Sequence, residues 1–86
     1  MRYSVTWDRD AENELTQIWL DAPDRAAVSA AANAIDRELA NDAERKGVDF
    51  YGDRLIVMRP LCVTFRVVHG DRLVIVRQVS RIATKS

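Results

Sequence analysis

The sequence is poor in the residues that form cross-links and bind metals. It contains one cysteine, Cys62, and one histidine, His69. A single cysteine excludes a disulfide within the chain and fits a reducing compartment, so we expect a cytoplasmic protein. With one thiol and one imidazole, a conventional zinc site is excluded within a single chain. We therefore expect neither a metal nor another cofactor.

Long apolar segments are also missing. No uncharged run approaches the roughly 20 residues that a transmembrane helix needs. The opening residues "MRYSVTWDRD" contain no apolar core of the kind found in a secretory signal. We expect no membrane contact.

The composition is that of one globular domain spanning residues 1–86, with 48% apolar and 30% charged residues. The net charge of zero is unevenly distributed. Residues 1–50 carry six basic and eleven acidic side chains, a net charge of −5, whereas residues 51–86 carry seven and two, a net charge of +5. This asymmetry indicates an anionic partner, or else two halves that neutralise each other within the fold.

The first half has the pattern of a strand followed by two helices. Alternating polar and apolar residues predict a strand over residues 3–7. Asp8 suits the N-cap of a first helix, and Pro23 interrupts it, because the residue before a proline disfavours helical geometry. A second helix is expected over residues 24–46, ended by Gly47. The predicted buried stripes are Ala11, Leu15, Ile18, Trp19 and Ala22 on the first helix, and Val28, Ala31, Ala32, Ile35 and Leu39 on the second.

The sequence then changes to the period of strands. The segments "RLIVM" (54–58), "LCVTFRVV" (61–68) and "RLVIVRQV" (72–79) predict three strands, reversed at Arg59–Pro60 and at Gly70–Asp71. The predicted order is β-α-α-β-β-β. This order gives an α+β domain in which a helical hairpin packs on one face of a small, mainly antiparallel sheet.

The hairpin of residues 61–79 is expected to have two unlike faces. A two-residue turn at Gly70–Asp71 fixes its register. The pairs that face the helices are then Val67–Val74, Phe65–Val76 and Val63–Gln78. The opposite face holds Cys62, Thr64, Arg66, Val68, Leu73, Ile75 and Arg77. No second helical layer is predicted to cover this face, so its apolar and basic side chains indicate a partner surface. The alternative is a solvated face that tolerates its valines.

Four single residues are expected to have structural roles. His69 belongs to the hairpin turn and has no orienting partner in the sequence. Cys62 is expected to be a half-buried filler. Trp7 and Trp19 fall in apolar periods and are expected in the core.

Three segments carry a resemblance to a known family. They are "YSVTWDRDAENEL", the helix break in "IWLDAPDRAA", and "RLIVMRPLCVTFRVVHGDRLVIVRQVSRI". From Tyr3 to Ile82 the chain resembles the RelE/ParE superfamily, the toxins of bacterial type II toxin–antitoxin systems. The resemblance implies a cognate antitoxin that wraps and neutralises the toxin. It also implies a target that is either ribosome-bound mRNA, which some members cleave, or a protein such as DNA gyrase, which others inhibit.

The nuclease members imply catalytic residues on the uncovered sheet face. RNA cleavage needs a group that activates the 2′-OH, a cation for the phosphate and an acid for the leaving oxygen. The residues here that could bind phosphate or target are Arg54, Arg59, Arg66, Arg77 and Arg81, of which Arg66, Arg77 and Arg81 are the catalytic candidates. Arginine stays protonated and supplies no acid–base pair, and Cys62 stands where nuclease members place an arginine. A toxin without nuclease activity is therefore preferred.

An apolar set completes the expected partner surface. Its members are Leu55, Val57, Thr64, Val68, Leu73 and Ile75. The antitoxin is the expected occupant, and a second copy of the chain, forming a homodimer, is an alternative. The sequence pI of about 6.6 leaves one further alternative, a non-toxic binding or dimerising module of the same fold.

Overall fold

A computed structural model describes residues 2–82 of the chain. Met1 and residues 83–86, which the domain prediction included, lie outside the described residues. The elements follow one another as β1 (Ser4–Trp7), α1 (Arg9–Asp21), α2 (Arg25–Ala40), the 3₁₀ turn η1 (Ala43–Arg45), β2 (Val48–Phe50), β3 (Asp53–Met58), β4 (Leu61–Val68) and β5 (Leu73–Arg81).

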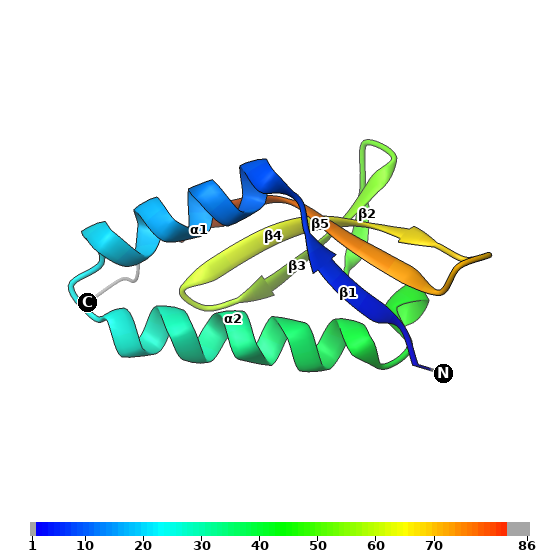
Figure 1. The fold of residues 1–86 in the computed structure, drawn as a ribbon, viewed down its shortest axis with the longest axis horizontal. Helices are drawn as coiled ribbons and strands as arrows, with labels where there is room; N and C mark the ends of the chain where they lie inside the picture. Colours follow the sequence, from blue (N-terminus) through cyan, green and yellow to red (C-terminus); the bar gives the residue numbers. More distant parts are fainter. Residues whose placement is uncertain (1, 83–86) are drawn as a thin grey trace.

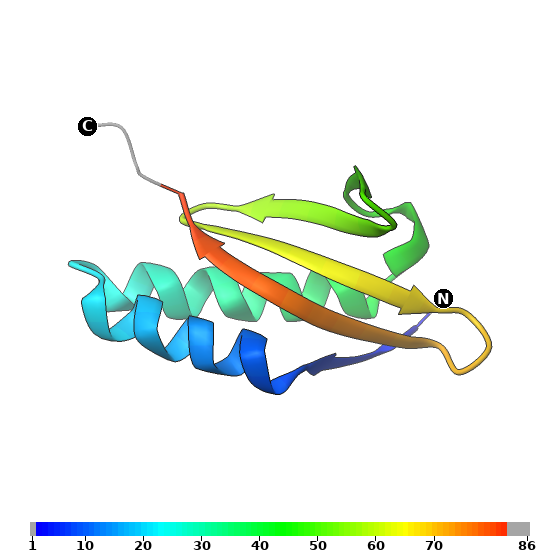
Figure 2. The same ribbon diagram turned by 90° about the horizontal axis from the view of Figure 1, so that it is seen from above.

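The strands form one sheet in the order β1-β5-β4-β3-β2 (Figure 1). β1 runs parallel to β5, and the other three neighbouring pairs are antiparallel. Both helices lie on one side of this sheet, as Figure 2 shows. The predicted α+β architecture, with a helical hairpin on one face of a mainly antiparallel sheet, is confirmed.

Side-chain caps fix where both helices begin. The Asp8 carboxylate accepts the backbone N–H of Ala11 at 2.9 Å, and Asp24 accepts that of Ala27 at 3.0 Å. Each cap satisfies a donor that has no partner within the helix itself. The helix break predicted around Pro23 is confirmed, because α1 ends at Asp21 and α2 begins at Arg25.

The predicted end of the second helix at Lys46 was wrong, because α2 ends at Ala40. The Tyr3 backbone N–H donates to the Ala40 carbonyl at 2.8 Å, and the Asn41 side-chain amide donates to the Arg37 carbonyl at 3.0 Å. Asp42 then takes a left-handed conformation, which short polar residues tolerate better than most. A contact from the start of the chain thus helps to end the helix, and local propensity does not contain that information.

Strand β2 was not predicted. It pairs with β3 through a tight turn at Tyr51 and Gly52. The φ angles of these two residues are positive, 49° for Tyr51 and 88° for Gly52. Two positive φ angles match the twist of a two-residue hairpin. Because tyrosine rarely adopts this conformation, the sequence carried only a weak turn signal here.

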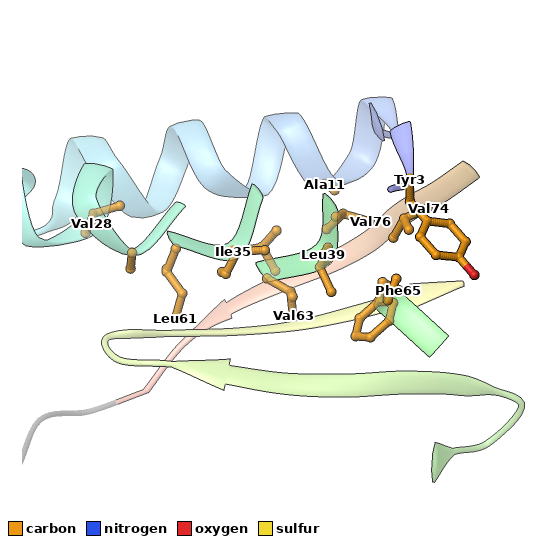
Figure 3. Packing of buried hydrophobic residues seen from close by; sticks show 13 residues of the cluster. Tyr3, Ala11, Val28, Ile35, Leu39, Leu61, Val63, Phe65, Val74 and Val76 are labelled. Atoms are coloured by element: carbon orange, nitrogen blue, oxygen red, sulfur yellow. The ribbon is translucent and has the colours of Figure 1, made fainter. Parts of the chain in front are cut away.

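The core fills the space between the helices and the sheet (Figure 3). Its buried members are Tyr3, Ala11, Val28, Ala31, Ile35, Leu39, Ala43, Leu61, Val63, Phe65, Val74, Val76 and Val79. Helix α2 supplies four of them and α1 only Ala11, so the predicted stripe of α2 is confirmed more fully than that of α1. Trp7 packs partly against the core, but the core position expected for Trp19 was wrong. Its side chain is 37% exposed, and Arg25 stacks on its ring 4.6 Å from the centroid.

The register of the β4–β5 hairpin agrees with the prediction only near the turn. Val67 pairs with Val74 and Phe65 with Val76, as expected, but Val63 pairs with Val79 instead of Gln78. The cause is a β-bulge: Phe65 pairs with Val76 and Thr64 with Gln78, so Arg77 on β5 is an extra residue. Beyond the bulge, each residue of β5 faces the side of the sheet opposite to the one predicted. Val79 therefore lies in the core, and Gln78 points away from it.

Candidate functional site

The side of the sheet away from the helices is the open face. The strand pairings place on it the side chains of Val48, Phe50, Asp53, Leu55, Val57, Cys62, Thr64, Arg66, Val68, Leu73, Ile75 and Gln78. All six predicted partner-binding residues are therefore on this face. Five of them are at least partly exposed, but Thr64 is buried.

The bulge leaves Arg77 as the extra residue between Val76 and Gln78, opposite the Thr64–Phe65 step of β4. Bulges commonly redirect a side chain in this way. The Arg77 Nε lies 3.5 Å from Oδ2 of Asp53, whose Oδ1 accepts a 3.1 Å hydrogen bond from the Arg66 Nε. One carboxylate therefore holds both arginines and offsets part of their charge.

Arg54 has a different role. Its guanidinium donates to the carbonyls of Lys46 at 2.7 Å and Gly47 at 3.1 Å, and to the Asp49 carboxylate at 3.1 Å. These three contacts fasten the segment before β2 to the start of β3. The side chain is occupied in holding the fold together, so its predicted role in binding phosphate has no support in this geometry.

Arg59 and Arg81 lie at the other end of the sheet. They border a hollow together with Pro23, Asp24 and Pro60, next to the loop that joins the helices. Arg81 pairs with Leu61, whose side chain is in the core, and the bulge therefore puts Arg81 on the helix side. The five candidate arginines are thus split, and only Arg66 and Arg77 come together on the open face.

A cleft of about 510 Å³ lies at the corner of the open face where α1 begins. We call it the acidic cleft. Its lining residues are Asp8, Asp10, Asn13, Glu14, Phe50, Tyr51, Asp53, Thr64, Arg77 and Gln78. They come from the start of α1, the β2–β3 hairpin and the strands β4 and β5. Four carboxylates and one guanidinium therefore line it, so a face predicted to be basic is acidic at this corner.

Glu14 connects the cleft to the sheet. Its Oε1 accepts the backbone N–H of Val79 at 2.8 Å. β1 covers the edge of β5 only as far as Val76, so this donor would otherwise lack a strand partner. The Glu14 carboxylate thus satisfies a backbone donor at the edge of β5, and the same residue lines the cleft.

Thr64 lies between two neighbouring hollows of the open face. It borders the acidic cleft and a second hollow formed with Leu55, Cys62 and Ser80. The residue is only 6% exposed, and within residues 2–82 its Oγ1 has no hydrogen-bond partner. A buried hydroxyl without a partner costs free energy.

Two aromatic rings form one wall of the cleft. Phe50 and Tyr51 meet edge to face, with ring centroids 4.9 Å apart. Tyr51 is 96% exposed and has a positive φ, which is an unfavourable conformation for a tyrosine. Neither residue was singled out from the sequence, because their place beside Arg77 depends on the unpredicted strand β2.

The histidine and the cysteine lie apart from the acidic cleft. His69 is in the β4–β5 turn, where its carbonyl accepts the Arg72 backbone N–H at 3.3 Å, and Cys62 is a half-buried free thiol. Both positions match the expectations. Within residues 2–82 no three carboxylate, imidazole or thiol groups converge in a way that would hold a metal ion.

Comparisons with known proteins identify the fold. No model of a protein family matches the sequence, and no curated protein is a significant match. Solved structures do match. The toxin–antitoxin complex RelBE2 from Mycobacterium tuberculosis has a TM-score of 0.76 at 17% identity, with 98% of this chain and 95% of that chain covered. The chain has the RelE/ParE fold.

Two further structures agree. The chromosomal ParDE system from P. aeruginosa has a TM-score of 0.67 at 18% identity and covers 95% of this chain and 98% of its own. The isolated RelE toxin from E. coli has a TM-score of 0.59 at 14% identity, with coverage of 98% and 88%. Neither helix described has an apolar stretch long enough to cross a membrane.

Proposed function

We propose that this chain is the toxin component of a type II toxin–antitoxin system, acts in the cytoplasm, and is neutralised by a cognate antitoxin. The proposal is supported by the fold, which matches toxin–antitoxin proteins over nearly the whole length of both chains. Within residues 2–82, no helix or strand covers the open face.

The open face also has the composition of a partner surface. Val48, Phe50 and Val57 are large apolar residues that remain exposed on neighbouring strands β2 and β3. Exposed apolar side chains gathered on one face mark a site for association. An antitoxin segment lying across these strands would bury them.

We further propose that the target is a protein, such as DNA gyrase, and not ribosome-bound mRNA. The observation that carries this choice is the pairing of Arg66 and Arg77 with the single carboxylate of Asp53. Both arginines are committed to an anion of the chain itself, and more carboxylates flank them. A scissile phosphate would meet this negative charge, and the two arginines themselves stay protonated and supply no general acid or base.

A dimerising module is the second candidate. Strand β2 ends the sheet, and its three residues are all exposed. An edge strand offers unpaired backbone groups to another strand. A second copy of the chain could pair there, whereas the homodimer considered from the sequence would place the second copy on the open face.

Growth after inducible expression of the wild-type chain tests the proposal. We expect growth arrest, no new cleavage in ribosome-bound mRNA, and inhibition of purified gyrase supercoiling. A double variant, Arg66→Ala with Arg77→Ala, is compared with Arg59→Ala with Arg81→Ala, which lies at the other end of the sheet. Relief of arrest by the first variant alone places the target on the open face. Soluble, folded protein that causes no arrest contradicts the toxin proposal, and codon-specific cleavage of mRNA contradicts the protein target.

A further inference from the structure

We infer that the acidic cleft is a receptor for an arginine side chain, presented by an extended segment of the antitoxin. The partner segment at this corner of the sheet is therefore basic. The identity of the partner rests on the proposed function, whereas the binding of a guanidinium group is a property of this chain alone.

The charge of the cleft selects a cation. Asp8, Asp10 and Glu14 line it, and no cationic side chain among residues 2–82 forms an ion pair with them. Arg77, the only cationic residue in the lining, already pairs with Asp53. A cation entering the cleft is attracted by these carboxylates, which no cationic side chain of residues 2–82 neutralises, and a phosphate is repelled by them.

Thr64 supplies a second observation at the cleft. The residue lines the cleft, and its buried hydroxyl makes no hydrogen bond among the described residues. A hydroxyl oxygen accepts a hydrogen bond, and a guanidinium group offers five donors in a planar fork. Phe50 and Thr64 both line the acidic cleft and the second hollow beside it.

The aromatic wall favours arginine over other cations. Phe50 and Tyr51 offer ring surface to one side of the cleft, and a guanidinium group stacks on such rings while it bonds to carboxylates. The carboxylates are spread along the start of α1 and do not converge on a point, which suits a long side chain better than a metal ion.

A titration of the full-length chain with two small molecules tests the inference. The ¹⁵N-labelled protein is followed by NMR as N-acetyl-arginine amide is added, and again with N-acetyl-citrulline amide, which has nearly the same shape without the charge. We expect saturable shifts at residues 8–14, 50–53 and 77–79 with the arginine compound only. Equal shifts with the citrulline compound, or shifts elsewhere, would overturn the inference.

Paired variants locate the site. Asp10 borders the cleft and Glu12, also in the first turn of α1, does not. Asp10→Asn should weaken binding about tenfold, because it removes the charge from one hydrogen-bond acceptor of the guanidinium group. Glu12→Gln removes the same helix-dipole charge and should leave binding unchanged. If the two variants bind the arginine compound equally well, the cleft is not its binding site.

Thr64→Val provides a second variant that keeps the fold. It removes the hydroxyl and preserves the shape, so binding should weaken while the protein remains folded. Binding at wild-type strength would overturn the role of the hydroxyl.

The titration is separate from the test of toxin function. The titration can fail while expression still arrests growth, and it can succeed where growth is unaffected.

Discussion

The carboxylate of Glu14 accepts the backbone N–H of Val79 across 2.8 Å, although the two residues are 65 positions apart in the chain. The contact joins α1 to β5 just beyond the point where β1 stops pairing. A charged side chain at an open strand edge also discourages pairing with another chain. Glu14 therefore satisfies a backbone donor and places a charge at the part of the β5 edge that β1 does not cover.

Replacement of Glu14 should be destabilising. In Glu14→Ala the Val79 N–H loses its partner, and we expect the free energy of unfolding to fall by about 1–3 kcal/mol. Urea denaturation followed by circular dichroism measures the change. Glu12→Ala is the matched control and should cost less than about 0.5 kcal/mol. Equal losses in the two variants would show that the contact does not stabilise the fold.

Replacement of Thr64 should have the opposite effect. Thr64→Val exchanges a buried hydroxyl without a partner for a methyl group, and we expect a gain of about 1–3 kcal/mol in unfolding free energy. Thermal unfolding by calorimetry shows this as a higher Tm. Thr6→Val, at an exposed strand position, should shift the free energy by less than about 0.5 kcal/mol. A loss of stability in Thr64→Val would mean that the hydroxyl is satisfied in solution.

Two glycines with positive φ should respond differently to alanine. A Cβ at Gly52 would meet open space, so Gly52→Ala costs only the left-handed backbone conformation, about 1–2 kcal/mol. A Cβ at Gly47 would collide with the backbone carbonyl of Leu55, which adds about 1–3 kcal/mol of overpacking. Denaturant midpoints of the two variants compare them directly. The close packing of Gly47 is disproved if Gly52→Ala is equally destabilising.

Removal of the shared carboxylate should change how the open face interacts with nucleic acid. Asp53→Asn releases Arg66 and Arg77, so we expect tighter, salt-dependent binding of a labelled single-stranded RNA in fluorescence anisotropy. Stability should fall by only about 0.2–1 kcal/mol for each ion pair, because both arginines are substantially exposed. Asp71→Asn, in the exposed β4–β5 turn, is the control for net charge. Equal RNA binding by the two variants would show that Asp53 does not mask the arginines.

Much of the fold could be predicted because its signals are local. The period of strands identified β1, β3, β4 and β5, the start of the first helix follows from the Asp8 cap, and the break between the helices follows from proline geometry at Pro23. The hairpin register near Gly70–Asp71 was also correct, since a short turn leaves little freedom to the residues beside it. Of the five candidate arginines, Arg66 and Arg77 were placed on the face away from the helices, where the structure has them, but their shared partner Asp53 was not predicted.

What the sequence determined by itself is therefore the order of the elements, the sides of α2 and β4 that enter the core, and the uneven distribution of charge. Only the tertiary structure decided how that charge is used. The bulge at Arg77 and the unpredicted strand β2 bring Asp53 to both arginines, and α1 adds its carboxylates at the same corner. These contacts join residues far apart in the chain. They depend on the summed energies of packing and strand pairing, which no local pattern of residues contains.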